Sequence, residues 1–112
     1  MNVLVWNCRG VGGLLTILQL EEIAKLHSPN LIFLFETKNT KCVMNKVKMK
    51  LRFGNLFVVE PRGKAGGLAT MWRNDIKVNR ILYTDFTIEL LIEDQRKNCK
   101  WWLIGIYASS GD

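Results

Sequence analysis

Two polar residues stand directly after short apolar segments in the first third of the chain. Asn7 follows residues 3–6, and Glu36 follows residues 31–35. If both segments are neighbouring parallel strands, their carboxyl ends lie about 5 Å apart, at the sheet edge where open α/β sheets bind ligands. A carboxylate beside an amide suits Mg²⁺, which takes one or two carboxylates together with waters and phosphate oxygens. We therefore interpret Asn7 and Glu36 as candidate metal-site residues.

Other groups suited to phosphate lie near these positions in the sequence. The loop 9–13 offers Arg9 and backbone N–H groups to an anion. Tyr107 ends the last apolar segment, so its hydroxyl points either at the same site or at a buried carbonyl. Candidate nucleic-acid contacts also include Lys38, in the basic segment 38–52, and Arg62 and Lys64, in the glycine-rich turn 62–67.

Each of these residues also has a purely structural interpretation. Glu36 is placed to cap a following helix, and Asn7 to form hydrogen bonds within a turn. The lysines of segment 38–52 are typical of a solvated helix face. A dinucleotide-binding fold is a further alternative, because Gly10 and Gly12 follow a strand and open a helix. That fingerprint is incomplete, since Leu15 stands where its third glycine belongs.

The elements that would position these residues follow from hydrophobic spacing. Residues 3–6 and 31–35 are expected to be buried strands, and residues 14–27 have helical periodicity, which gives one β-α-β unit. Residues 37–52 are expected to form a second helix. Strands are then expected at 56–60, 68–72, 76–83, 86–93 and 100–107, with close turns that imply antiparallel pairing. The predicted fold class is α/β with a mixed sheet.

Composition limits the class of protein. The chain has 112 residues, 48% of them hydrophobic, which indicates one domain over residues 1–112 and excludes intrinsic disorder. Sixteen Lys and Arg against ten Asp and Glu give a formal charge of +6, which favours a polyanionic partner. No apolar run spans a membrane, and no secretory signal is apparent.

The cysteines and the histidine carry little chemistry. Cys8, Cys42 and Cys99 form no metal-binding or disulfide pattern, so we expect reduced thiols and a nuclear or cytoplasmic location. His27 is the only histidine. The chain ends at residues 108–112, directly after the last apolar segment, which suggests the front portion of a larger domain.

Four segments, taken in order, carry a family resemblance. They are VWNCRG at 5–10, PNLIFLFETK at 29–38, GGLATMW at 66–72 and GIY at 105–107. As a set they resemble the endonuclease/exonuclease/phosphatase superfamily. Within it, they look most like the N-terminal part of the endonuclease domain of plant non-LTR (LINE-type) retroelements.

The resemblance implies a four-layer α/β sandwich and a Mg²⁺-dependent hydrolase that nicks DNA, with Mn²⁺ as the alternative ion. By resemblance, Glu36 binds the metal, Asn7 orients the metal site and Tyr107 hydrogen-bonds the scissile phosphate. The family's later Asp, Asn and His motifs have no counterpart here, so we expect a weakly active or inactive fragment, 1–112, of such a domain. A non-catalytic basic nucleic-acid-binding module and a small-molecule or lipid phosphatase remain alternatives.

Overall fold

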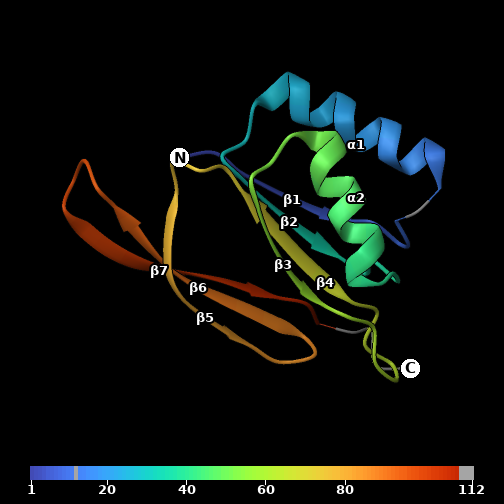
Figure 1. The fold of residues 1–112 in the computed structure, drawn as a ribbon. Helices are drawn as coiled ribbons and strands as arrows, with labels where there is room; N and C mark the ends of the chain where they lie inside the picture. Colours follow the sequence, from blue (N-terminus) through green and yellow to red (C-terminus); the bar gives the residue numbers. More distant parts are fainter. Residues whose placement is uncertain (12, 109–112) are drawn as a thin grey trace.

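The structure is a computed structural model that describes residues 1–11 and 13–108. Gly12, a glycine of the predicted phosphate loop, and the chain end at 109–112 lie outside the described residues. Two helices and seven strands are described (Figure 1): β1 Val3–Asn7, α1 Leu14–His27, β2 Leu31–Phe35, α2 Lys41–Leu51, β3 Asn55–Val59, β4 Leu68–Trp72, β5 Lys77–Tyr83, β6 Thr87–Asp94 and β7 Cys99–Ile106.

The described strands form two sheets. The first has the order β1-β2-β4-β3, in which β1 and β2 are parallel and β4 is antiparallel to both of its neighbours. The second is the antiparallel sheet β5-β6-β7. This confirms the predicted α/β class, the parallel β1–β2 pair and the antiparallel pairing of the later strands. No helix among the described residues is long and apolar enough to cross a membrane.

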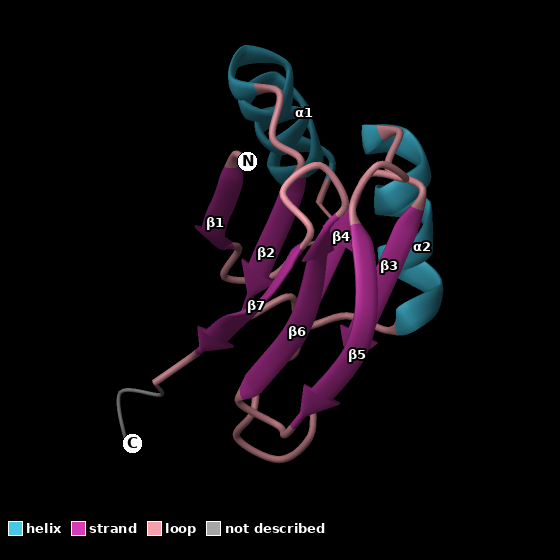
Figure 2. Cartoon of the chain, turned by 90° about the vertical axis from the view of Figure 1, so that its left-hand side faces the viewer, coloured by secondary structure: helices cyan, strands magenta, loops and turns pink. Residues whose placement is uncertain are grey.

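The first sheet lies between the helices and the second sheet (Figures 1 and 2). All five residues of β2 are buried, as its unbroken apolar run predicts. Ile32 and Leu34 belong to the core cluster under the helices, which includes Leu20 of α1 and Met44 of α2. Leu31, Phe33 and Phe35 belong to the cluster between the sheets. The strand that carries Glu36 at its end is therefore held from both faces.

The predicted start of the second helix is wrong. We expected a helix from residue 37, but α2 begins at Lys41, and the Thr40 side chain caps it by accepting a hydrogen bond from the Val43 N–H at 3.3 Å. Glu36 and Lys38 instead have φ of +53° and +51°, a left-handed conformation that no α-helix continues. Glu36 is therefore not the helix cap, and Lys38 lies in a loop rather than on a basic helix.

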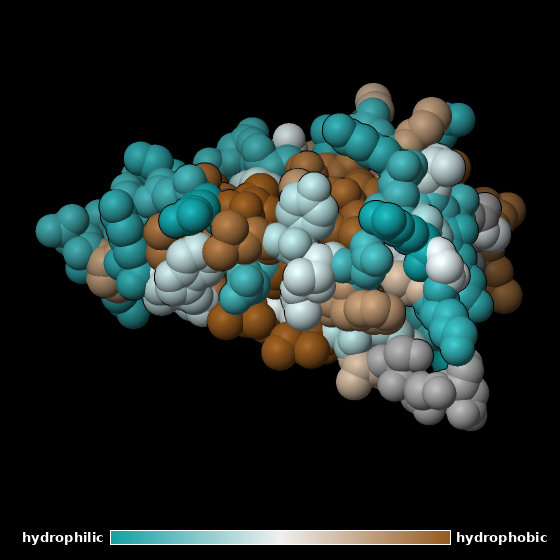
Figure 3. Space-filling model, turned by 90° about the horizontal axis from the view of Figure 1, so that it is seen from below, coloured by the Kyte–Doolittle hydropathy of each residue, from teal (hydrophilic) through white to brown (hydrophobic). Residues whose placement is uncertain are grey.

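The second sheet covers the first only in part. A Cβ built on Gly105 of β7 would lie 2.6 Å from the Phe33 ring, so β7 packs closely against β2. The inner face of β1 is left open at the edge, where Val3 is 37% exposed and Val5 is 60% exposed. Large apolar side chains are also exposed on the second sheet, among them Ile104 and Ile106, and Figure 3 shows apolar surface on the side seen from below.

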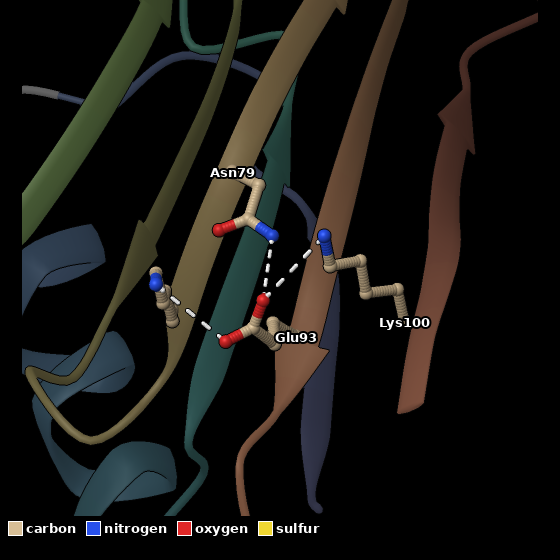
Figure 4. A network of polar contacts seen from close by, with 4 residues as sticks. Asn79, Glu93 and Lys100 are labelled. Atoms are coloured by element: carbon tan, nitrogen blue, oxygen red, sulfur yellow. Dashed lines mark hydrogen bonds and ion pairs between the residues drawn. The ribbon is translucent and has the colours of Figure 1, made fainter. Parts of the chain in front are cut away.

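A polar network ties the three strands of the second sheet together. The Glu93 carboxylate of β6 accepts a hydrogen bond from the Asn79 amide at 3.0 Å. It also pairs with Lys77 of β5 at 3.5 Å and Lys100 of β7 at 3.7 Å (Figure 4). The Asn79 hydrogen bond is the main cause that lowers the pKa of Glu93. These contacts give Glu93 a structural role in the second sheet.

Candidate functional site

The parallel pairing brings Asn7 and Glu36 to one edge of the first sheet. Asn7 pairs with Phe35 in the strand register, so Glu36 follows directly beside it. The pairing continues past the strands, because the N–H of Gly10 donates to the Glu36 carbonyl at 2.7 Å and that of Val11 donates to the Thr37 carbonyl at 2.8 Å. The juxtaposition predicted from two strand ends is thus present.

The backbone of Glu36 is strained and held in place by the glycines of the 61–67 loop. A left-handed conformation is unfavourable for a residue with a Cβ, and such residues persist where their surroundings fix them. The N–H groups of Thr37 and Lys38 donate to the carbonyls of Gly67 and Gly66, at 3.2 and 2.7 Å. A Cβ on Gly66 would lie 3.3 Å from the Glu36 Cγ, so the loop packs directly against the glutamate.

Tyr107 reaches the Glu36 carboxylate from the other sheet. Its ring stacks on Phe35 with centroids 5.8 Å apart, and its N–H donates to the Phe86 carbonyl at 2.9 Å. Hydrogen bonding with the Tyr107 hydroxyl is the largest cause that lowers the pKa of Glu36. The same contact, as its largest cause, raises the pKa of Tyr107. The pair therefore consists of an ionised carboxylate and a protonated phenol at neutral pH.

Asn7 contributes both to the turn and to the site. Its Oδ1 accepts a hydrogen bond from the Arg9 N–H at 3.1 Å, which confirms the predicted turn interaction. Hydrogen bonding from Asn7 also lowers the pKa of Glu36, after the effect of Tyr107. Because its oxygen is engaged in the turn, the N–H₂ is the part of the amide left to interact with the carboxylate.

Of the four predicted basic contacts, two act on Glu36. The charges of Lys38 and Arg9 lower its pKa, and the Lys38 side chain lies over Gly10, where a Cβ would be 3.8 Å from its Cδ. Arg62 and Lys64 are exposed in the small hairpin closed by Arg62 and Ala65. No hydrogen bond or ion pair among the described residues joins those two side chains to Glu36.

Cys8 lies close to this carboxylate as a neutral thiol. It is buried, and burial, followed by the charge of Glu36, raises its pKa to about 12. A thiol with such a pKa is a poor nucleophile at neutral pH. Cys42 and Cys99 are exposed, and all three cysteines are free.

The donor set fits a hard divalent cation that is held mainly by other ligands. Glu36 supplies one carboxylate, and the described residues contain no group of three or more His, Cys, Asp or Glu side chains that would form a closed metal cage. Mg²⁺ commonly binds through one or two carboxylates, completed by waters and substrate phosphates. His27, the last residue of α1, is at the opposite end of the first sheet.

Sequence reasoning missed the residues that support this site. Phe35 and Phe86 fix the position of Tyr107, and Gly66 allows the loop to approach Glu36. The pair Gly66–Gly67 was the available signal, because Gly67 has a φ of +93° and a Cβ there would lie 2.5 Å from the Thr37 hydroxyl oxygen. Nothing in the sequence pattern indicates the left-handed backbone of Glu36.

Comparison with solved structures places this fold among known ones. The catalytic domain of Xenopus laevis APE2 superposes with a TM-score of 0.67 at 15% identity, over 100% of this chain and 46% of that one. The AP endonuclease LMAP from Leishmania major superposes with a TM-score of 0.67 at 16% sequence identity, over 96% of this chain and 40% of that one. TDP2 from C. elegans superposes with a TM-score of 0.59 at 13% sequence identity, over 92% of this chain and 34% of that one. No protein-family model and no curated protein matches the sequence.

These neighbours define the class of fold. They have the endonuclease/exonuclease/phosphatase-like α/β fold, and the present chain shares it. The chain spans less than half the length of each of the three.

Proposed function

We propose that Glu36, Asn7 and Tyr107 are part of a Mg²⁺-dependent site that hydrolyses phosphodiester bonds in DNA, with Mn²⁺ as the alternative ion. One arrangement carries this proposal: Asn7 at the end of β1 and Tyr107 after β7 both flank the strained Glu36, because Asn7 pairs with Phe35 and the Tyr107 ring stacks on Phe35, the residue before Glu36. Strained residues are concentrated at functional sites. Two of the fold neighbours, the catalytic domain of Xenopus laevis APE2 and the AP endonuclease LMAP, agree with this class of function.

The three residues have distinct roles in the proposed site. Glu36 holds the cation through its carboxylate, which stays ionised because its pKa is lowered. When bound, such an ion neutralises the charge of the phosphate oxygens. Asn7 and Tyr107 orient the carboxylate and can turn their N–H and O–H donors to a phosphate oxygen. Because the pKa of Tyr107 is raised, its hydroxyl remains a donor throughout the neutral range.

Basic residues attract the substrate in this proposal. Arg9 and Lys38 lie close enough to act electrostatically on Glu36, so they would face a phosphate bound there. Arg62 and Lys64 project from the neighbouring hairpin and would contact nucleic acid further along the backbone. These four positive charges would make binding to DNA sensitive to salt.

We further propose that residues 1–112 form the N-terminal part of a larger domain of this kind, of plant LINE-type origin. The sequence motifs support the origin. Two features support the incomplete domain: the neighbours are more than twice as long, and the inner face of β1 is uncovered beside β7. A partial site binds a cation and phosphate but hydrolyses poorly, because loss of a base or of a phosphate-stabilising group commonly costs about 10²–10⁴-fold each.

A cation titration tests the site. We expect the chain to bind Mg²⁺ weakly, with a dissociation constant on the order of millimolar, by calorimetry or by chemical-shift titration. Glu36→Gln should abolish this binding. Glu89→Gln removes one carboxylate from the second sheet, away from the site, and should leave binding unchanged. Equal loss of binding in both variants would contradict the proposed site.

A nicking assay on supercoiled plasmid tests the chemistry. We expect Mg²⁺-dependent nicking that is slow, and that Glu36→Ala reduces to background. Nicking that survives Glu36→Ala would remove Glu36 from the metal site. The alternative, a non-catalytic basic module, predicts salt-sensitive DNA binding that neither EDTA nor Glu36→Ala changes.

A further inference from the structure

A second basic site lies at the opposite end of the first sheet from Glu36. A hollow of about 770 Å³ opens between the C-terminal ends of α1 and α2. Figure 1 shows both helices ending on the side of the molecule where the chain begins. Arg73 lines this hollow and directly follows Trp72, which pairs with Leu31, the first residue of β2. Glu36 lies at the other end, directly after Phe35, the last residue of β2. Along β2 the two positions are separated by roughly 15 Å.

Basic side chains dominate this hollow. Lys25 of α1, Lys50 of α2, Arg52 and Arg73 line it, and Glu21 is the only acidic residue among the described residues that line it. Lys50 lies 3.8 Å from the Glu21 carboxylate, so this pair is largely self-neutralised. Lys25, Arg52 and Arg73 therefore leave an excess of positive charge in a concave surface, where the field of several charges is focused.

Arg73 is held in position before any ligand arrives. Its Nε–H donates to the Pro29 carbonyl at 3.0 Å, and its Cζ lies 4.7 Å from the centroid of the Phe53 ring. Its own N–H donates to the Asn30 carbonyl at 3.0 Å. Among the described residues, no hydrogen bond uses its two Nη groups. A pre-oriented guanidinium loses little side-chain entropy when these groups bind an anion.

The helix ends explain only some of these charges. A helix C-terminus attracts cations, which accounts for Lys25 and Lys50 in the last turns of α1 and α2. Terminal carbonyls are already capped, since the Ser28 N–H donates to Ala24 and the Arg52 N–H donates to Lys48. Arg73 comes from neither helix. Its place in the hollow has no counterpart in helix capping.

We infer that this hollow binds a phosphate group, independently of the Glu36 site. The Nη groups of Arg73 suit paired contacts with two phosphate oxygens. Lys25 and Arg52 supply the remaining positive charge for a dianionic tetrahedral group. The shared chemistry is the phosphate, whether it belongs to a small phosphate compound or to a polynucleotide.

Titration with inorganic pyrophosphate, at low ionic strength and with EDTA present, tests this inference. The double variant Lys25→Gln/Arg52→Gln removes two charges whose side chains make no ion pair among the described residues. We expect it to weaken pyrophosphate binding about tenfold. The matched control Arg80→Gln/Lys97→Gln has the same net charge but changes β5 and the turn between β6 and β7, and it should weaken binding less than twofold. Similar weakening in both variants would overturn the inference.

Two further measurements keep the test independent of folding and of the Glu36 site. Arg73→Lys keeps the charge but loses the paired N–H groups, so it should also weaken pyrophosphate binding while the circular dichroism spectrum stays unchanged. Unchanged affinity in that variant would contradict the role given to Arg73. Glu36→Ala should leave pyrophosphate binding intact, and loss of binding there would assign it to the Glu36 site.

A short single-stranded oligonucleotide in parallel identifies the source of the phosphate. Weakening of both probes by Lys25→Gln/Arg52→Gln supports a polynucleotide phosphate. Weakening of pyrophosphate alone supports a small phosphate compound.

Discussion

The left-handed backbone of Glu36 predicts an unusual order of stability among substitutions at this position. Inside a helix or strand, a protein with glycine at a given position is less stable than the same protein with alanine there by roughly 0.5–1 kcal/mol. At a φ of +53° the order should reverse, because alanine retains the steric conflict of a Cβ, which costs roughly 1–2 kcal/mol, whereas glycine does not. After subtracting the greater entropy that glycine gains in the unfolded chain, we expect Glu36→Gly to be about 1 kcal/mol more stable than Glu36→Ala.

Both variants lose the same carboxylate contacts, so the difference between their free energies of unfolding reports the backbone conformation at this position. Urea unfolding followed by circular dichroism measures it. The same pair of substitutions at Glu89, inside β6, is the control and should show the ordinary order, with alanine the more stable. If Glu36→Ala proved as stable as Glu36→Gly, Glu36 would not occupy the strained conformation on which its proposed role rests.

Three other predictions concern the surroundings of Glu36. Gly67→Ala should cost about 2–3 kcal/mol in urea unfolding, because a Cβ there meets the Thr37 hydroxyl oxygen at 2.5 Å and φ is +93°; a loss below about 0.5 kcal/mol would be inconsistent with this packing. In the native protein at pH 7, iodoacetamide followed by mass spectrometry should modify Cys42 and leave Cys8 unreacted, since burial raises the pKa of Cys8 to about 12; rapid modification of Cys8 would argue against its burial. The lowered folded-state pKa of Glu36 adds stability that is present above the ordinary glutamate pKa of 4.5 and is lost as the pH falls through the folded value; Glu36→Gln should therefore reduce the acid dependence of the unfolding free energy, and an identical pH profile would contradict the shift.

Much of the fold could be predicted because its signals are local. The apolar run 31–35 defines a strand buried on both faces, and the helical spacing of 14–27 defines α1 with the bounds observed. Close turns after residue 56 predict antiparallel strands. The division into two sheets depends on which strands pair across long distances, as in β2 with β4, and no local pattern specifies that choice.

The candidate site could be predicted in part for the same reason. Asn7 and Glu36 follow recognisable strands, so topology alone brings them together. The start of α2 was missed because Glu36 and Lys38 adopt a left-handed backbone that depends on contacts with Gly66 and Gly67 from a distant loop. The hollow around Arg73 is likewise formed by three separate segments, so its charges do not appear as a motif.

The most direct test of the central claim is a titration of the ¹⁵N-labelled chain with Mn²⁺, followed by paramagnetic line broadening. We predict that the Asn7 side-chain amide and the backbone amides of Glu36 and Tyr107 broaden first, and that Glu36→Gln removes this broadening. Broadening that begins instead around Glu93 and Asp94, or that persists in Glu36→Gln, would contradict a cation site at the ends of β1 and β2.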